Sequence, residues 1–441
     1  MAALDRLRQR PIAATEKGFG LLASGAGPVT AGSLAAERPP ALDATFTLPI
    51  LLVRDSALSR NTAAMAAWCA RAGVSLAPHG KTTMAPQIFA RQLAAGAWGL
   101  TAATIAQAQV YRAFGIDRIL IANELTDPAG IRWLGRELAA DPEFECYAYA
   151  DSVAGVRMLD AGLAVAENGL AASDTVPRRL KILVELGFRS GRTGCRDRET
   201  ALEVAAAVAA SDRLALAGAA GYEGGLGNDQ APATLDAVAA YCGRLAALAT
   251  ELRDQYERHR AAASAGDWIV SAGGSLYFDI VARELAPTGR GHGLAVVLRS
   301  GCYITHDHGG YAENGPGADR GGPELTAALE LWAPVLSVPE PGLALALAGR
   351  RDVGSDQGYP IPLRIRAASG DPATERAADG LAVTALNDQH AYLRLPPQVA
   401  LSPGDLLCLG ISHPCTTLDK WRVIPVADDD YQVIDVIHTF F

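Results

Sequence analysis

Lys81 is the residue of this sequence whose type and position point most directly to chemistry. It lies in the stretch Leu-Ala-Pro-His-Gly-Lys-Thr-Thr-Met-Ala-Pro, after a short apolar run at 73–77 and before a segment with helical spacing at 86–95. A lysine at the carboxyl end of a β-strand stands where α/β folds place their reactive groups. Its amine can form a Schiff base with an aldehyde cofactor. We therefore expect Lys81 to be catalytic.

Two other interpretations compete for Lys81. The triplet Gly80-Lys81-Thr82 resembles the end of a phosphate-binding P-loop. That motif requires a glycine five residues before its second glycine, where this chain has Ser75. A solvated surface lysine is the commonest state of this residue type. The motifs at the other predicted strand ends argue against that state.

The chain around Lys81 alternates between strand and helix patterns. Apolar runs predict strands at 74–77, 98–101, 118–122, 145–150, 180–186, 214–218, 268–272 and 295–299. Helical periodicity fills the intervals, at 86–95, 105–114, 129–139, 153–161, 198–210, 235–260 and 276–284. About eight such units in roughly 250 residues are typical of a (β/α)8 TIM barrel. A doubly wound sheet is the alternative, but the glycine-rich run 221–227 lacks the spacing of a dinucleotide fingerprint.

The alternation ends near residue 315. Short runs at 331–339, 342–347, 361–366, 381–386, 391–395, 405–410 and 432–437, separated by Pro, Gly and Asp, predict an all-β domain. A strand is predicted at 46–53, before the barrel, and it must pair with other strands. A helix at 56–72, capped by Ser56, follows it. We therefore expect an N-terminal segment, residues 1–48, packed on the β domain, a barrel at 49–315, and a C-terminal β domain at 316–441.

Composition limits the partners and the compartment. The 39 basic and 48 acidic residues give a net charge of −9, which argues against nucleic acid or an anionic membrane as the main partner. Seven cysteines without a CxxC pair argue against a disulfide framework and for a reducing compartment. The sequence shows neither a signal-peptide pattern nor an uncharged apolar run of membrane-spanning length. We expect a cytoplasmic protein that acts on a small molecule.

Two Gly/Ser clusters follow the last predicted barrel strands. Gly273-Gly274-Ser275 and Ser300-Gly301 suit a phosphate, because glycine lets backbone N–H groups approach an anion. Ser275 adds a hydroxyl, and the following helix adds its positive end. Simple turn chemistry is the alternative for either cluster alone. Barrels commonly hold phosphates at their last strands, and this favours a phosphate site.

The β domain carries a separate motif, Ser412-His413-Pro414-Cys415. Residues two apart in an extended segment point to the same side, so an imidazole and a thiolate could share one metal ion. Zinc fits these ligands best, and a third ligand must come from elsewhere. His306-x-His308 is a rival pair without a thiolate, for which we favour a polar loop at the barrel rim.

Taken in order, these motifs resemble those of the fold-type III pyridoxal-phosphate enzymes related to alanine racemase. The closer resemblance is to the branch that holds D-threonine aldolase and eukaryotic-type D-serine dehydratase. It spans about residues 50–425, through segments 78–82, 92–99, 119–123, 191–194, 221–224, 273–275, 299–303 and 413–415. The chain departs from its relatives at Thr83 and Met84, where they often have histidine and lysine, and at Ala77, where they have arginine.

The resemblance implies a homodimer with active sites at the subunit interface, in which Lys81 holds pyridoxal 5'-phosphate covalently. The other implied cofactor-binding residues are His79, Arg192, Tyr222, Gly273, Gly274, Ser275, Ser300, Gly301, Cys302 and Tyr303. His413 and Cys415 are the implied ligands of a divalent metal, zinc in the first place and manganese as the alternative.

The implied activity is dehydration of a D-3-hydroxy amino acid of the D-serine type to a keto acid and ammonia. Aldol cleavage of D-threonine is the alternative. The His-x-Cys motif favours dehydration, because enzymes of the aldolase branch resemble one another in having His-x-Asp at this position. A racemase would need a catalytic tyrosine from the β domain, for which Tyr359 and Tyr392 are available. A non-enzymatic carrier of the cofactor would resemble the barrel alone.

Overall fold

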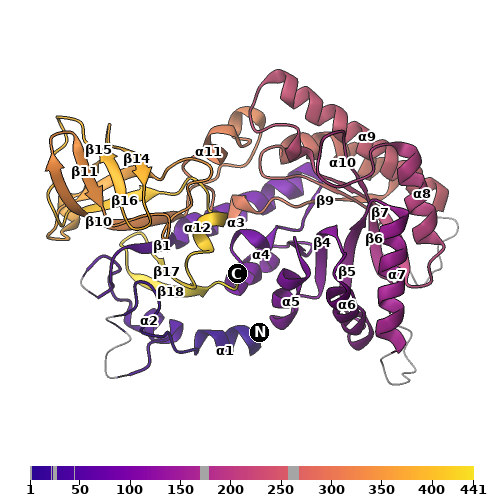
Figure 1. Ribbon diagram of the computed structural model, residues 1–441, viewed down its shortest axis with the longest axis horizontal. Helices are drawn as coiled ribbons and strands as arrows, with labels where there is room; N and C mark the ends of the chain where they lie inside the picture. Colours follow the sequence, from indigo (N-terminus) through magenta and orange to yellow (C-terminus); the bar gives the residue numbers. More distant parts are fainter. Residues whose placement is uncertain (1, 21, 23–26, 44, 169–177, 257–267) are drawn as a thin grey trace.

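The computed structural model describes residues 2–20, 22, 27–43, 45–168, 178–256 and 268–441. Figure 1 shows a barrel of strands and helices beside a separate β domain, drawn in orange and yellow. Helices α11 (Gly310–Asn314) and α12 (Cys415–Leu418) lie between the two bodies. None of the helices in these described ranges combines the length and apolar character that a membrane crossing requires.

The barrel is a curled parallel sheet of eight described strands. In chain order these are β2 (Ser75–Leu76), β3 (Leu100–Ala102), β4 (Arg118–Glu124), β5 (Glu145–Ala150), β6 (Leu180–Leu186), β7 (Leu214–Gly221), β8 (Trp268–Ala272) and β9 (Leu294–Leu298). They pair in the order β2-β9-β8-β7-β6-β5-β4-β3. Trp98 N–H donates to the carbonyl of Leu76 at 2.7 Å, and Thr101 N–H donates to that of Pro78 at 3.0 Å. These bonds join the two edge strands, so the predicted barrel fold is confirmed.

The outer layer consists of the helices between the strands. They are α3 (Asp55–Ala72), α4 (Pro86–Ala94), α5 (Ile105–Ala113), α6 (Pro128–Ala140), α7 (Val153–Asn168), α8 (Arg198–Ala209), α9 (Pro232–Tyr256) and α10 (Phe278–His292). The predicted cap at Ser56 is wrong, because α3 begins one residue earlier and Ser56 Oγ donates to Asp429 instead. Helix α10 runs past its predicted end and contains Pro287. Of the helix predicted at 235–260, residues 257–260 lie outside the described residues.

Side chains fill the barrel interior in layers. The middle of the barrel is a buried cluster of Ala77, Leu120, Tyr147, Tyr149, Leu183, Ala217, Ala220, Ile269 and Val297. Because side chains alternate along a strand, residues two positions further on face inward one layer higher. Strand β7 bulges near Gly218, where φ is +140° and a Cβ would lie 1.8 Å from the carbonyl oxygen of Ile269. This backbone therefore requires glycine.

The second sheet is predominantly antiparallel and has ten described strands. It contains β1 (Ile50–Arg54), β10 (Leu329–Glu340), β11 (Leu343–Ala346), β12 (Ile361–Arg366), β13 (Arg376–Ala377), β14 (Ala382–Leu386), β15 (Ala391–Arg394), β16 (Leu406–Gly410), β17 (Val423–Ala427) and β18 (Val433–His438). The predicted all-β domain is confirmed. Strand β17 was not predicted, because it contains Pro425, which argues against an interior strand.

Strand β1 joins the N-terminal part of the chain to this sheet. It pairs antiparallel with β10 and parallel with β17. Residues 50–54 were predicted as part of the barrel at 49–315, but they lie in the sheet of the β domain. Helix α2 (Ala31–Glu37) contacts β18. Phe19, Phe46 and Ile50 share one buried cluster with Trp332 of β10. Figure 1 shows helices α1 (Ala2–Arg8) and α2 below β17 and β18.

Candidate active site

A cavity of about 690 Å³ lies at the carboxyl ends of the barrel strands, where the β domain meets them. Its lining includes the predicted residues Lys81, His79, Arg192, Tyr222, Gly273, Gly274, Ser275, Ser300, Gly301, Cys302, His413 and Cys415. Tyr303 does not belong to this lining. Its side chain is buried elsewhere, and its hydroxyl accepts a hydrogen bond from Gln92 at 3.1 Å. A cofactor contact of Tyr303 stays a prediction that its side chain does not support.

Lys81 lies on a single 3₁₀ turn, residues Gly80–Thr82, directly after β2. Met84 N–H donates to the carbonyl of Gly80 at 2.8 Å, which closes the turn. Gly80 packs so tightly that a Cβ there would lie 2.4 Å from the hydroxyl of Tyr111. The backbone of this turn is therefore fixed, while the side chain of Lys81 is exposed toward the cavity.

His79 precedes Lys81 and is held as a neutral imidazole. Burial lowers its pKa well below the usual value, and the positive charges of Lys81 and Arg299 lower it further. Its Nδ1 is buried without a hydrogen-bond partner. A neutral ring with one unused nitrogen can pack against a cofactor without adding a charge.

Arginines shape two sides of the cavity. The guanidinium of Arg192 lies over the ring of Tyr222, 4.2 Å from its centroid, which is a cation–π contact. Arg299 is buried and donates to Ser271 Oγ at 2.8 Å and to the carbonyl of Gly221 at 2.7 Å. Arg299 is the first residue of the segment 299–303 that carries the family resemblance, but it was not predicted as a site residue. Its place directly after the last barrel strand was a usable signal.

The glycine loop after β8 already binds a carboxylate of the chain itself. The N–H groups of Gly273 and Gly274 donate to Glu223 at 3.1 and 2.5 Å, and Glu223 is fully buried. Ser300 Oγ donates to the carbonyls of Gly273 and Gly274, both at 3.1 Å, so the two predicted phosphate loops are joined. Ser275 and the start of α10, which has no side-chain cap, remain as donors for a phosphate.

The His-x-Cys motif faces the same cavity from the β domain. His413 Nδ1 lies 2.7 Å from a carboxylate oxygen of Asp356, whose other oxygen accepts from Thr416 Oγ1 at 2.7 Å. This pairing leaves Nε2 of His413 for a metal. Cys415 Sγ lies 3.7 Å from Cys302 Sγ, and all seven cysteines are free thiols. An imidazole and a thiol are donors that suit zinc, so the residues present fit such an ion.

The rival pair His306 and His308 does not converge on a ligand. The His306 ring stacks on Tyr311, with 4.7 Å between centroids, and its Nδ1 lies 2.8 Å from the carbonyl of Asp307. Neither histidine lines the cavity.

Several lining residues were missed by the sequence analysis. Tyr311 directs an unpartnered, buried hydroxyl at this region, and Asp307 accepts backbone N–H bonds from the start of α11. Asp356 lies in an irregular loop between β11 and β12. Loops have no periodicity, and α11, which carries Tyr311, is only five residues long, so the sequence gives no signal for the positions of these three side chains.

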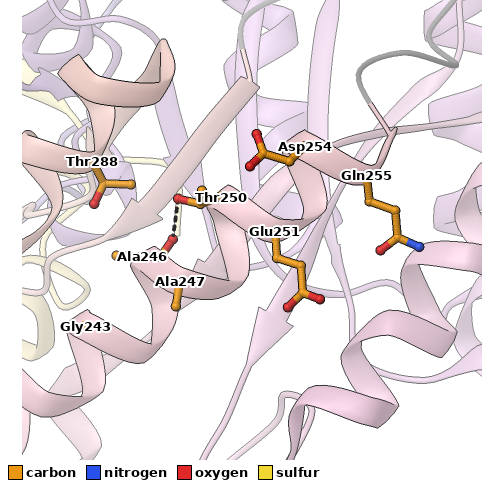
Figure 2. A pocket seen from close by; sticks show the side chains of 8 residues that line it. All are labelled: Gly243, Ala246, Ala247, Thr250, Glu251, Asp254, Gln255 and Thr288. Carbon is orange, nitrogen blue, oxygen red and sulfur yellow. Dashed lines mark hydrogen bonds between the residues drawn. The ribbon is translucent and has the colours of Figure 1, made fainter.

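A larger depression of about 840 Å³ lies along the outer side of α9 (Figure 2). Figure 2 shows that Glu251 and Asp254 point in different directions. Thr250 Oγ1 donates to the carbonyl of Ala246 at 3.0 Å, and Glu251 is bound by Arg198. Its polar groups do not converge, so this depression is not the candidate site.

The family model of a putative serine dehydratase domain matches residues 328–427 of this chain. D-threonine aldolase of Arthrobacter sp. is 28% identical over 371 residues, which cover 83% of this chain and 85% of that protein. A 3-hydroxy-D-aspartate aldolase of Paracoccus denitrificans is 25% identical over 318 residues, covering 71% and 74%.

Solved structures show the same architecture. D-threonine aldolase from Filomicrobium marinum gives a TM-score of 0.72 at 25% identity, covering 90% of this chain and 95% of that one. D-threo-3-hydroxyaspartate dehydratase from Delftia sp. HT23 gives 0.67 at 22% identity, covering 90% and 98%. The predicted resemblance is confirmed. The chain is similar to D-threonine aldolase, to 3-hydroxy-D-aspartate aldolase and, over residues 328–427, to a putative serine dehydratase domain, and its fold is that of the alanine racemase-like proteins.

Proposed function

We propose that this protein is a lyase that uses pyridoxal 5'-phosphate and a divalent metal to dehydrate D-3-hydroxy amino acids of the D-serine type, releasing a keto acid and ammonia. One observation carries the proposal. Lys81 from the barrel and the pair His413 and Cys415 from the β domain line the same cavity. The proposed covalent amine site and the proposed metal site would thus be within reach of one small substrate.

The residues around Lys81 suit a phosphorylated aldehyde. Lys81 would hold the aldehyde carbon, and Ser275, Gly301, Cys302 and the start of α10 would hold the phosphate. Arg192 on Tyr222, with neutral His79, would flank the ring. When bound, the cofactor supplies an electron sink for the bonds at the α-carbon. Once displaced by substrate, the amine of Lys81 would take the α-proton, because its side chain stays free in the cavity.

The metal would lie at the other end of the substrate. His413 Nε2 and Cys415 Sγ would hold it, with Asp356 fixing the orientation of the imidazole. A zinc ion supplies Lewis-acid polarisation of the β-hydroxyl oxygen, which makes that hydroxyl a better leaving group. Manganese is the alternative ion, although a thiol ligand favours zinc. We also propose a cytoplasmic homodimer with the cavity at its interface, as the family resemblance implies.

Aldol cleavage of D-threonine is the second candidate. The specific observation in its favour is that the curated relatives are named D-threonine aldolase and 3-hydroxy-D-aspartate aldolase. Dehydration is favoured by the thiol at Cys415 and by the serine dehydratase model, which covers both His413 and Cys415. A racemase has less support, because neither Tyr359 nor Tyr392 of the same chain lines the cavity.

The test is a product analysis. The protein loaded with cofactor and zinc is incubated with D-serine, D-threonine and D-threo-3-hydroxyaspartate, with the L-enantiomers as controls. Keto acid plus ammonia supports the proposal, whereas glycine plus an aldehyde supports the aldolase. A change of configuration without ammonia supports a racemase.

The Lys81→Ala variant tests the role of the lysine. We expect it to lose both the visible absorption of the Schiff base and all turnover, because no other described lysine lines the cavity. Lys420→Ala, which changes a lysine of the β domain outside the cavity lining, is the control and should keep both. A yellow, active Lys81→Ala protein would refute the assignment.

A further inference from the structure

Three carboxylates gather at the carboxyl ends of neighbouring barrel strands, and the proposed reaction does not use them. Glu124 ends β4, Asp151 directly follows β5, and Glu185 is the penultimate residue of β6. Oxygens of all three lie within 4.8 Å of one another. Glu185 is two residues past Leu183 of the inner layer, and Asp151 is two past Tyr149, so both face the barrel interior.

These carboxylates lack the partners that buried negative charges need. None of the three forms a salt bridge with any described residue. Both oxygens of Glu124 and Oε2 of Glu185 are buried without a hydrogen bond, and Glu185 is 5% exposed. Asp151 accepts one N–H bond, from Gly194 at 3.1 Å. Burying charged carboxylates without partners destabilises the folded chain unless a bound ion or proton neutralises them.

The hydroxyl of Tyr149 is a further buried oxygen beside the three carboxylates, and it also suggests a ligand there. Tyr149 is 2% exposed, and its hydroxyl has no hydrogen-bond partner among the residues that the structure describes. Its Cα pairs with that of Glu124 across β4 and β5, and it lines the cavity together with Glu185. Arg299 lies 5.8 Å from the Tyr149 ring, but its guanidinium donates to Ser271 and Gly221 instead.

We propose that Glu124, Asp151 and Glu185 bind a hard divalent cation, with the hydroxyl of Tyr149 directed at the ion or at a water on it. The donors are all oxygen, as calcium, magnesium and manganese prefer, and they share no residue with the soft pair His413 and Cys415. The inference goes beyond the proposed function and does not depend on it. The ion would tie together the ends of three strands that form one wall of the cavity.

A shared proton is the competing explanation. Burial, followed by the negative charge of Glu185, raises the pKa of Glu124 to about 8 in the cation-free chain. One proton would neutralise one of three charges, whereas a divalent ion neutralises two and also gives Glu185 and Tyr149 a partner. A bound cation would displace this proton, so the two explanations can be separated by experiment.

The experiment measures Ca²⁺ binding by equilibrium dialysis, because Ca²⁺ takes oxygen ligands and avoids the imidazole–thiol pair. The full chain loaded with pyridoxal phosphate is compared with its His413→Ala/Cys415→Ala double variant. Both should bind one Ca²⁺ per chain. Glu185→Gln should weaken binding at least tenfold, Tyr149→Phe several-fold, and Glu340→Gln, at the exposed end of β10, should leave it unchanged.

Two results would overturn the proposal. One is that the wild-type chain binds no Ca²⁺ at millimolar concentrations, or binds Ca²⁺ equally well after Glu185→Gln. The other is an infrared carboxylic-acid band at pH 7 that persists in Ca²⁺ and disappears in Glu124→Gln, which would assign a proton to the cluster. Asp151→Asn replaces Glu185→Gln if that variant does not fold. Turnover is not a readout here, so failure of the proposed lyase activity would leave this result intact.

Discussion

At the scale of single residues, Asp356 decides which nitrogen of His413 is free. Its carboxylate holds Nδ1 at 2.7 Å and is itself held by Thr416. Partners of this kind fix the ring orientation of a metal-binding histidine, and their loss typically weakens metal binding about 10- to 100-fold. We expect Asp356→Asn to weaken zinc binding by about this factor, measured by competition with a chromogenic chelator.

The matched control for Asp356 is Asp379→Asn, which changes an exposed carboxylate of the same domain. It should bind zinc like the wild type. Equal zinc affinity in Asp356→Asn and Asp379→Asn would show that the carboxylate does not position His413. Asp356→Glu should restore part of the affinity, since it keeps the acceptor.

At the scale of elements, Glu223 fastens the end of β7 to the loop after β8. Its buried carboxylate accepts from Gly273 N–H and Gly274 N–H. Hydrogen bonds to a charged group contribute about 1.5–3 kcal/mol, and unpaired buried donors add a further cost. We expect Glu223→Ala to lower the free energy of unfolding by about 3 kcal/mol in urea, and Glu223→Gln by less, because it keeps one acceptor.

Glu340→Ala, at the exposed end of β10, is the control for this loss and should change stability little. If Glu223→Ala were as stable as this control, the carboxylate would not hold the loop. Cofactor affinity gives a second measure, because the same loop leads into Ser275 and the start of α10.

Local patterns account for what could be predicted at this scale. Strands at 145–150, 180–186 and 268–272 coincide with β5, β6 and β8, because uninterrupted apolar runs between helices leave one interpretation. The predicted residues after β6 and β8, Arg192 and residues 273–275, line one cavity, because parallel strands bring their carboxyl ends to one edge. The strand-end rule applies equally to Glu124, Asp151 and Glu185, which were missed although they lie at the ends of β4, β5 and β6. Asp356 could not be predicted, because it lies in an irregular loop and its partner His413 is distant in sequence.

At the scale of the whole molecule, the β domain is tied to the barrel close to Lys81. Phe440 N–H donates to the carbonyl of Met84 at 3.0 Å, and Gln87 Nε2 donates to that of Val436 at 3.2 Å. Figure 1 shows the C-terminus beside α4 and α5. On the other side of the cavity, His308 N–H donates to the carbonyl of Ile411 at 2.9 Å. The orientation of the metal motif relative to Lys81 therefore depends on this junction.

Two histidines at this junction, His308 and His438, make its stability depend on pH. Burial lowers the pKa of each to about 4, and both have a buried ring nitrogen without a partner. Between pH 6.5 and 4 the unfolded chain binds these protons and the folded chain does not, so stability falls as the pH falls through this window. Lowering the pKa of a histidine from 6.5 to about 4 corresponds to roughly 3 kcal/mol of stability for each residue.

We therefore expect His308→Gln/His438→Gln to lose less stability than the wild type between pH 7 and pH 4.5, measured as the free energy of urea unfolding at each pH. The difference in stability loss between the two proteins reports on the two histidines alone, because the carboxylates of the chain titrate in both proteins. His292→Gln, on the exposed end of α10, should follow the wild type. Parallel pH profiles of the double variant and the wild type would show that acid acts elsewhere than at the domain junction.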